Sequence, residues 1–131
     1  MRDIKFRAWE KSLKEMIPVY NIDFESKIIN TNSAWRMFDE VELMQYTGLK
    51  DKNGKEIYEG DVCSYLPKNA KHIYFETKWD DGYVTFIITA YKPFFHSLRF
   101  GFDIAAGELE VIGNIYENPE LLTWHINAFH L

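Results

Sequence analysis

The chain has 131 residues, of which 47% are hydrophobic and 17% aromatic, so it has enough apolar material for one domain with its own core. Its net charge is −5 and no lysine or arginine follows Arg99. This argues against nonspecific binding to duplex DNA, which depends on cations that displace phosphate counterions. Cys63 is the sole cysteine, so no internal disulfide can form. Neither a signal peptide nor a membrane span is visible in the sequence, and we therefore expect a cytoplasmic protein.

The first third of the chain predicts an N-terminal hairpin. Apolar and charged residues alternate over residues 4–8, and a second strand is expected over residues 16–20. Pro18 lacks the N–H that a central strand needs, so it favours an edge position or a bulge. A further strand is expected over residues 24–29, and the asparagines and serine of residues 30–33 predict a loop.

The middle of the chain alternates strands with sharp turns. A strand is expected over residues 41–47, ending at Gly48. The Asn-Gly pair at residues 53–54 is a strong turn signal, because both residues tolerate positive φ. A second corner at residues 59–61 leads into a strand over residues 62–66.

A further hairpin is the clearest local pattern. Apolar residues alternate with polar ones over residues 73–79, an Asp-Asp-Gly turn follows, and residues 83–91 return. The aromatic segment 94–104 is compatible with a strand or a packed loop. A last alternating strand is expected over residues 109–115.

The C-terminal segment carries the start signals of a short amphipathic helix. Asn118 can cap it and Pro119 suits its first position. Its apolar face would hold Leu122, Ile126 and Phe129. A helix of about three turns is marginal in water, so this face must dock on its own domain or on a second subunit. The surplus of apolar residues in the tail favours a homo-oligomer.

So many short strands in a chain of this length need a closed or nearly closed sheet, because open edges invite aggregation. The sequence therefore predicts a mainly β fold. It would be one small barrel-like domain over residues 1–131, with an N-terminal hairpin and a short C-terminal α-helix.

Three stretches in the same order resemble the YopX family of phage and prophage proteins. They are residues 4–9 (IKFRAW), residues 44–62 (MQYTGLKDKNGKEIYEGDV) and residues 111–122 (VIGNIYENPELL). The resemblance implies a β-rich fold, a phage or prophage association and a molecular role that is unknown; it brings no catalytic or ligand-binding residue with it. The segment 64–106 and the tail beyond Leu122 lie outside the pattern, and differences in partner between members would reside there.

The turn residues of the middle stretch have a structural interpretation, which we favour over a binding loop. Glycines permit unusual backbone angles, and aspartates accept hydrogen bonds from turn amides. The residues concerned are Gly48, Gly54, Gly60, Asp51 and Asp61. Tyr46 and Tyr58 are kept as candidate binding residues, because a tyrosine can pack its ring and still present its hydroxyl.

The ionisable residues do not form a recognisable catalytic or metal motif. Asp39, Glu40 and Glu42 lie close together, but a polar strand face explains them better than a cation site. Cys63 lies in a strand pattern, which favours packing over nucleophilic chemistry. The histidines lack the spacing of a zinc site and are scattered at positions 72, 96, 125 and 130. We therefore predict no catalytic residue, no metal, no cofactor and no enzymatic activity.

One alternative comes from the aromatic hairpin, since single-strand binders stack bases on exposed rings of a β surface. Its rings are Tyr74, Phe75, Trp79, Tyr83, Phe86 and Tyr91. Lys68, Lys71 and Lys78 are the candidate phosphate contacts, whereas Asp80 and Asp81 at the tip oppose them. A small β core needs such rings in any case, so nucleic acid is the less favoured partner.

The favoured function is a non-catalytic, phage-associated accessory protein that binds a host or phage protein. The alternatives are a single-stranded nucleic-acid-binding β domain and an enzyme with an unrecognised site.

Overall fold

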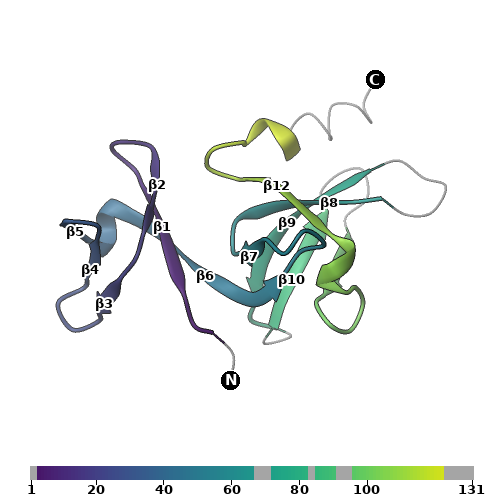
Figure 1. Ribbon diagram of the computed structural model, residues 1–131, viewed down its shortest axis with the longest axis horizontal. Coiled ribbons are helices and arrows are strands. Elements are labelled where there is room, and N and C mark those ends of the chain that lie inside the picture. The colour runs from purple at the N-terminus through teal and green to yellow at the C-terminus, as the bar shows by residue number, and fades with distance from the viewer. Residues whose placement is uncertain (1–2, 67–71, 83–84, 91–95, 123–131) are drawn as a thin grey trace. The chain divides into compact units, whose positions relative to one another are not determined.

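The computed structural model describes residues 3–66, 72–82, 85–90 and 96–122. The chain is built mainly from β-strands and divides into two compact units, Met1–Tyr46 and Thr47–Leu131 (Figure 1). Strand β6 (Val41–Lys50) begins in the first unit and ends in the second. One domain over residues 1–131 stays a prediction. Within the described ranges, no helix has the length and apolar character that a membrane crossing requires.

The predicted N-terminal hairpin is confirmed. Strand β1 (Phe6–Glu10) pairs antiparallel with β2 (Glu15–Pro18) and, on its other side, with β6. The carboxylate of Glu10 closes the hairpin turn, where it accepts the N–H of Leu13 at 2.6 Å and of Ser12 at 3.1 Å. β2 is the edge strand of its sheet, which is the position that its proline favours.

A three-stranded antiparallel sheet completes the first unit. It is formed by β3 (Asn21–Asp23), β4 (Ile28–Thr31) and β5 (Ala34–Met37), in that order. A short 3-10 helix, η1 (Phe38–Glu40), then leads into β6. The buried core of the unit consists of Ala8, Ile29 and Val41, and partly buried apolar side chains pack around it.

Two sequence predictions in this unit have the wrong strand boundaries. Residues 24–27 form a turn rather than the start of a strand, because the Asp23 carboxylate accepts the N–H groups of Glu25 and Ser26, both at 3.0 Å. The expected loop at residues 30–33 is a two-residue turn, since Asn30 belongs to β4 and Ser33 turns the chain with φ 64°. Local side-chain hydrogen bonds and left-handed residues therefore fix strand ends that propensity alone misplaces.

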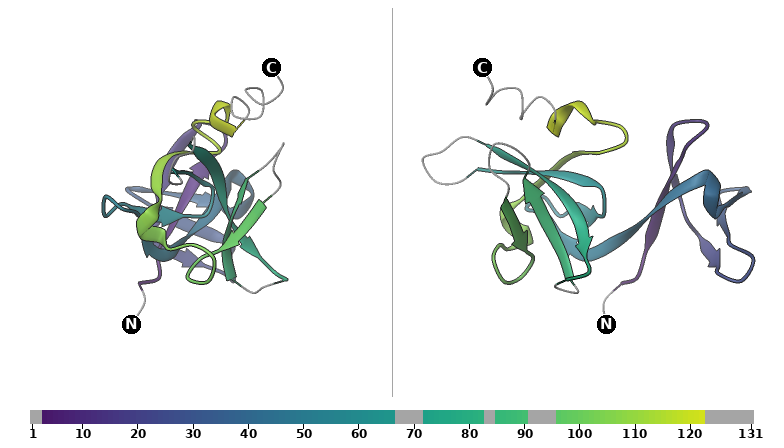
Figure 2. Two further views of the ribbon diagram at one scale, coloured as in Figure 1. Left: turned by 90° about the vertical axis from the view of Figure 1, so that its right-hand side faces the viewer. Right: turned by 180° about the vertical axis from the view of Figure 1, so that it is seen from behind.

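The second unit contains a five-stranded antiparallel sheet in the order β11-β10-β9-β8-β12. This sheet curls into a half barrel, which confirms the predicted barrel-like β fold (Figure 2). The strands of the unit are β7 (Glu56–Tyr58), β8 (Asp61–Tyr65), β9 (Ile73–Asp80), β10 (Thr85–Ala90), β11 (His96–Arg99) and β12 (Glu110–Asn114). A second 3-10 helix, η2 (Ala106–Glu108), precedes β12.

Pattern and structure agree closely in this unit. The predicted hairpin of residues 73–91 is present as β9 and β10, with Thr85 opposite Asp80. One difference concerns β6, which does not end at Gly48 but continues to Lys50, and the glycine adopts φ 86° within the strand. The core is formed by Ile57, Cys63, Phe75, Phe86, Ile88, Ala90, Phe100, Ile104, Ala106, Leu109 and Val111.

The predicted C-terminal helix is present but begins at Glu120, one residue after the expected first position at Pro119, and the described residues end at Leu122. Ile126 and Phe129 of the predicted apolar face lie outside the described residues. The homo-oligomer that rests on this face stays a prediction.

Candidate functional site

Asp51 joins the middle stretch of the chain to its last strand. Its side chain is buried, and its Oδ1 atom accepts the N–H of Asn53 at 2.8 Å and of Lys55 at 2.9 Å. Its Oδ2 atom accepts the N–H of Val111 on β12 at 2.8 Å. Burial raises the pKa of Asp51, but these three N–H groups outweigh it and hold the pKa below its ordinary value. The carboxylate is thus an ionised clamp whose acceptor atoms are used within the fold.

The corner before β8 is a second structural junction. Gly60 has φ 84°, its N–H donates to the carbonyl of Thr77 at 2.9 Å, and its own carbonyl accepts the N–H of Ile115 at 2.8 Å. The buried Asp61 carboxylate accepts the N–H of Tyr58 at 2.7 Å. Gly48 and Gly54 likewise have positive φ, as the structural interpretation of these glycines requires.

The stretch after β12 is also occupied by internal bonds. The side-chain oxygen of Asn114 accepts the N–H of Tyr116 at 3.0 Å and of Glu117 at 2.8 Å. The backbone N–H of Asn114 donates to Oδ1 of Asn118 at 3.2 Å. Gly113 leaves room for this arrangement, because a Cβ atom there would lie 2.5 Å from that Oδ1 atom. The side chains of Asn114 and Asn118 thus hold the backbone of residues 114–117 in place.

The binding candidates from the sequence are locally engaged. Tyr46 is buried, with the Lys5 ammonium 5.5 Å from its ring centroid. Tyr58 is half-buried and donates its hydroxyl to Glu56 at 3.2 Å. Lys78 is half-buried on β9 and has a partner within the chain. Lys68 and Lys71 lie outside the described residues. The three described candidates, Tyr46, Tyr58 and Lys78, belong to separate strands, β6, β7 and β9.

Two carboxylates at the start of β6 are also engaged within the chain. Glu40 accepts the N–H of Met37 at 2.9 Å, and Glu42 forms an ion pair with Lys11 at 3.4 Å. In the part of the chain that the structure describes, no three histidine, cysteine or acidic side chains gather as a metal ion would need. His72 is exposed and His96 lies on β11. The other two histidines lie outside the described residues.

Cys63 lies on β8 and is fully buried. Burial raises the pKa of its thiol to about 12, so the group is protonated at neutral pH.

We therefore expect a soluble aromatic disulfide reagent to leave Cys63 unmodified in the native chain and to modify it rapidly in denaturant. The absorbance of the released thiolate measures both rates. Rapid reaction under native conditions at pH 7.5 would contradict the buried, protonated state.

The aromatic hairpin does not form an open stacking platform in its described part. Phe75 and Phe86 are core residues. Trp79 is 44% exposed, but its Nε1 donates to the Asp81 carboxylate at 2.8 Å and its ring packs edge-on against Phe86 with a centroid distance of 5.1 Å. Tyr83 and Tyr91 lie outside the described residues.

The first unit exposes an apolar sheet face that the sequence reading missed. Strand pairing places Met37 beside Ile28 and Trp35 beside Asn30, on the side of the β3–β5 sheet away from Ile29. Trp35 is 58% exposed, Met37 is 47% exposed and Ile28 is half-buried. We call this surface the outer face. The signal in the sequence was the spacing of Trp35 and Met37, two residues apart, which places both on one face of a strand. The strand predicted from the sequence falls at residues 24–29 instead, and residues 34–37 are not predicted to form one.

A hollow borders the outer face where β5 ends. It has a volume of about 290 Å³ and shares Met37 with that face. Its walls are Lys27, Met37, Phe38 and Asp39. The outer face thus combines exposed apolar side chains with a depression that a protruding side chain can enter.

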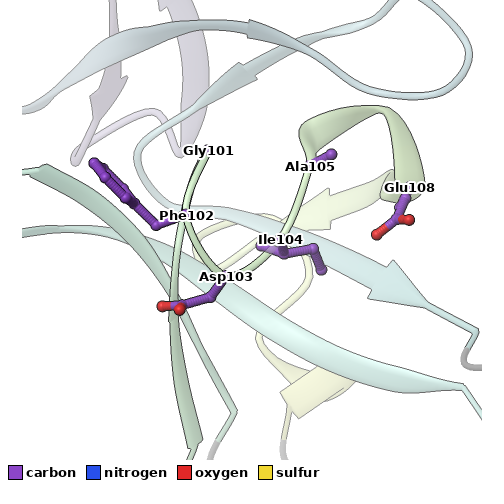
Figure 3. Close-up of a pocket in the computed structure, with 6 residues that line it drawn as sticks. All are labelled: Gly101, Phe102, Asp103, Ile104, Ala105 and Glu108. Atoms are coloured by element: carbon purple, nitrogen blue, oxygen red, sulfur yellow. The ribbon is translucent and has the colours of Figure 1, made fainter.

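A second pocket follows β11 in the second unit. Figure 3 shows Phe102 and Glu108 on opposite sides of the loop, with Ile104 and Ala105 between them. Phe102 is 77% exposed, whereas Ile104 is buried in the core. The sequence left this segment ambiguous. Phe102 follows Gly101 directly, and a residue beside a turn glycine is typically exposed. This was the signal in the sequence that the Phe102 ring would face solvent.

Comparisons with known proteins agree with the fold. The chain is similar to protein EF1440 from Enterococcus faecalis, with a TM-score of 0.65 and 31% identity over 93% of this chain and 99% of that one. It is also similar in fold to the yopX protein of Bacillus subtilis, with a TM-score of 0.60 and 19% identity over the same shares of the two chains. No curated protein is similar enough to count as a match. The model of the YopX protein family matches residues 5–123, and the chain therefore belongs to the YopX family.

Proposed function

We propose that this chain is a non-catalytic accessory protein of a phage or prophage that acts in the host cytoplasm by binding another protein, of host or phage origin. The observation that carries the proposal is the outer face of the β3–β5 sheet. The partner that fits it presents an apolar surface with a side chain that can enter the adjacent hollow.

The composition of the outer face supports this role. A sheet face that is turned to water usually carries polar side chains, whereas Trp35 and Met37 stand exposed here. Tryptophan and methionine are enriched in the cores of protein interfaces, and tryptophan is prominent among the few residues that dominate binding energy. The amide of Asn30 donates to Asn21 on the same face, so polar groups beside the apolar ones are already paired.

The ionisable residues support a binding role over a catalytic one. Asp51 and Asp61 are buried and accept backbone N–H groups, and the Cys63 thiol is buried and protonated. General acid–base or nucleophilic catalysis needs such groups to reach a substrate. The exposed apolar side chains of the outer face are accessible to a partner, whereas these ionisable groups are not.

We expect affinity capture with the tagged full chain from host cells to enrich a partner, and Trp35→Lys to reduce that enrichment by about tenfold or more, since truncation of an interface anchor costs at least that factor. Leu13→Lys is the matched control, because Leu13 is a similarly exposed apolar residue of the same unit at the hairpin turn. Quantitative mass spectrometry measures the enrichment. Equal capture by the parent chain and Trp35→Lys would refute the outer face as the contact surface.

A further inference from the structure

We propose that the pocket after β11 receives a lysine or arginine side chain from an extended segment of a partner protein. This contact is separate from the outer face, because it lies in the second unit and rests on different residues. The pocket is lined by Gly101, Phe102, Asp103, Ile104, Ala105 and Glu108.

The size of the pocket favours one side chain over a cofactor. Its volume of about 260 Å³ lies below the roughly 300–1,000 Å³ of typical small-molecule sites. Its walls combine apolar atoms of Ile104 and Ala105 with the carboxylate of Glu108 (Figure 3). An aliphatic stem with a polar end matches this combination.

The loop that forms the pocket is held in place by its own bonds. The Asp103 carboxylate accepts the backbone N–H of Arg99 at 2.8 Å and the guanidinium Nε of the same residue at 3.0 Å. Gly101 has φ 79° and donates its N–H to the carbonyl of Ile104 at 2.9 Å. The Ile104 and Ala106 side chains anchor the loop in the core. A bound segment would therefore meet a preformed surface, which lowers the entropic cost of binding.

The charge of the pocket selects a cation. Arg99 pairs with Asp103 and neutralises it, which leaves Glu108 as the remaining charge of the wall. Glu108 is exposed, and no cation among the described residues pairs with it. Lys52 donates its backbone N–H to the carbonyl of Leu109 at 2.9 Å, but its ammonium pairs with Glu110 at 3.4 Å. A phosphate backbone would be repelled here, whereas a lysine or arginine side chain would be attracted.

Phe102 adds an apolar and cation-attracting ring. The ring is 77% exposed, and the guanidinium of Arg99 lies 5.2 Å from its centroid. That contact already uses the negative π-face of the ring for Arg99, so the part of the ring that stays exposed offers apolar packing to a bound segment. It also steadies the ring. A neighbouring residue of the bound segment would pack on the exposed part of this side chain.

The experiment titrates the full ¹⁵N-labelled chain with an acetylated, amidated peptide of alternating lysine and glycine and follows amide shifts by NMR. We expect saturable shifts in residues 101–108 with a dissociation constant near 1 mM or tighter, weakening with added salt. Glu108→Gln and Phe102→Ala should each weaken binding about fivefold or more. Glu110→Gln is the matched control, since Glu110 already pairs with Lys52 at 3.4 Å. It should bind like the parent chain.

Three results would overturn the proposal: no saturable shift at these residues, equal affinity for a peptide with norleucine in place of lysine, or the same shifts with a short oligothymidylate. Both pocket variants change exposed side chains, so we expect them to fold like the parent chain, and thermal unfolding is the measurement that checks this. Trp35→Lys should bind the lysine peptide like the parent chain. Loss of peptide binding therefore tests this pocket, and loss of the captured protein in Trp35→Lys tests the outer face.

Discussion

Replacing Asp51 with alanine is expected to lower the free energy of unfolding by about 3–5 kcal/mol. A hydrogen bond to a charged group contributes about 1.5–3 kcal/mol, and the substitution leaves three backbone N–H groups without their acceptor. These N–H groups belong to Asn53, Lys55 and Val111. Chemical denaturation followed by tryptophan fluorescence measures the change. Asp23→Ala, which removes an exposed turn aspartate with two such bonds, is the control and should have a much smaller effect.

The Asp51 carboxylate is also expected to make the free energy of unfolding fall as the pH becomes acidic. The pKa of Asp51 is lower in the folded chain than its ordinary value of 3.8, so the folded state binds this proton less readily than the unfolded state. Its contribution to stability is present above pH 3.8 and is lost as the pH falls through the lower pKa of the folded state. Asp51→Asn should remove this part of the acid sensitivity. An Asp51→Ala chain as stable as the parent would contradict the clamp.

Replacing Gly60 with valine is expected to lower the free energy of unfolding by about 2–3 kcal/mol. The residue has φ 84° and is buried, and a β-branched side chain is strained at such an angle. Rotating φ to a negative value would break the bonds to Thr77 and Ile115. Thermal and chemical unfolding measure the loss.

Gly107→Val is the matched control for this substitution, because a Cβ atom at Gly107 meets nothing within 4 Å and its φ lies outside the left-handed range. It should change stability far less. A Gly60→Val chain that unfolds like the parent but no longer captures its partner would show that the corner is a recognition loop.

The sequence determined those features that depend on neighbouring residues. The hairpin of β9 and β10 follows from alternation and from an Asp-Asp-Gly turn, both of which act within a few residues. The turns at Gly54 and Gly60 follow from the freedom of glycine at positive φ. The same local reasoning placed Cys63 on a strand in the core rather than at a reactive surface. The resemblance to the YopX family rests on three stretches long enough to be specific, and the family model that matches residues 5–123 confirms it.

Tertiary structure alone decided which side chains remain exposed. Trp35 and Phe102 look like core residues in the sequence, because hydrophobicity reports a preference for burial and not whether a neighbouring element is present to cover the ring. Phe75 and Phe86 have the same chemistry and are buried, since the sheet folds over them. Asp51 resembles any turn aspartate until β12 comes within reach, 60 residues later in the chain, and its Val111 N–H takes the second carboxylate oxygen. Contacts between residues so distant in sequence are set by the packing of whole strands, which no local pattern reports.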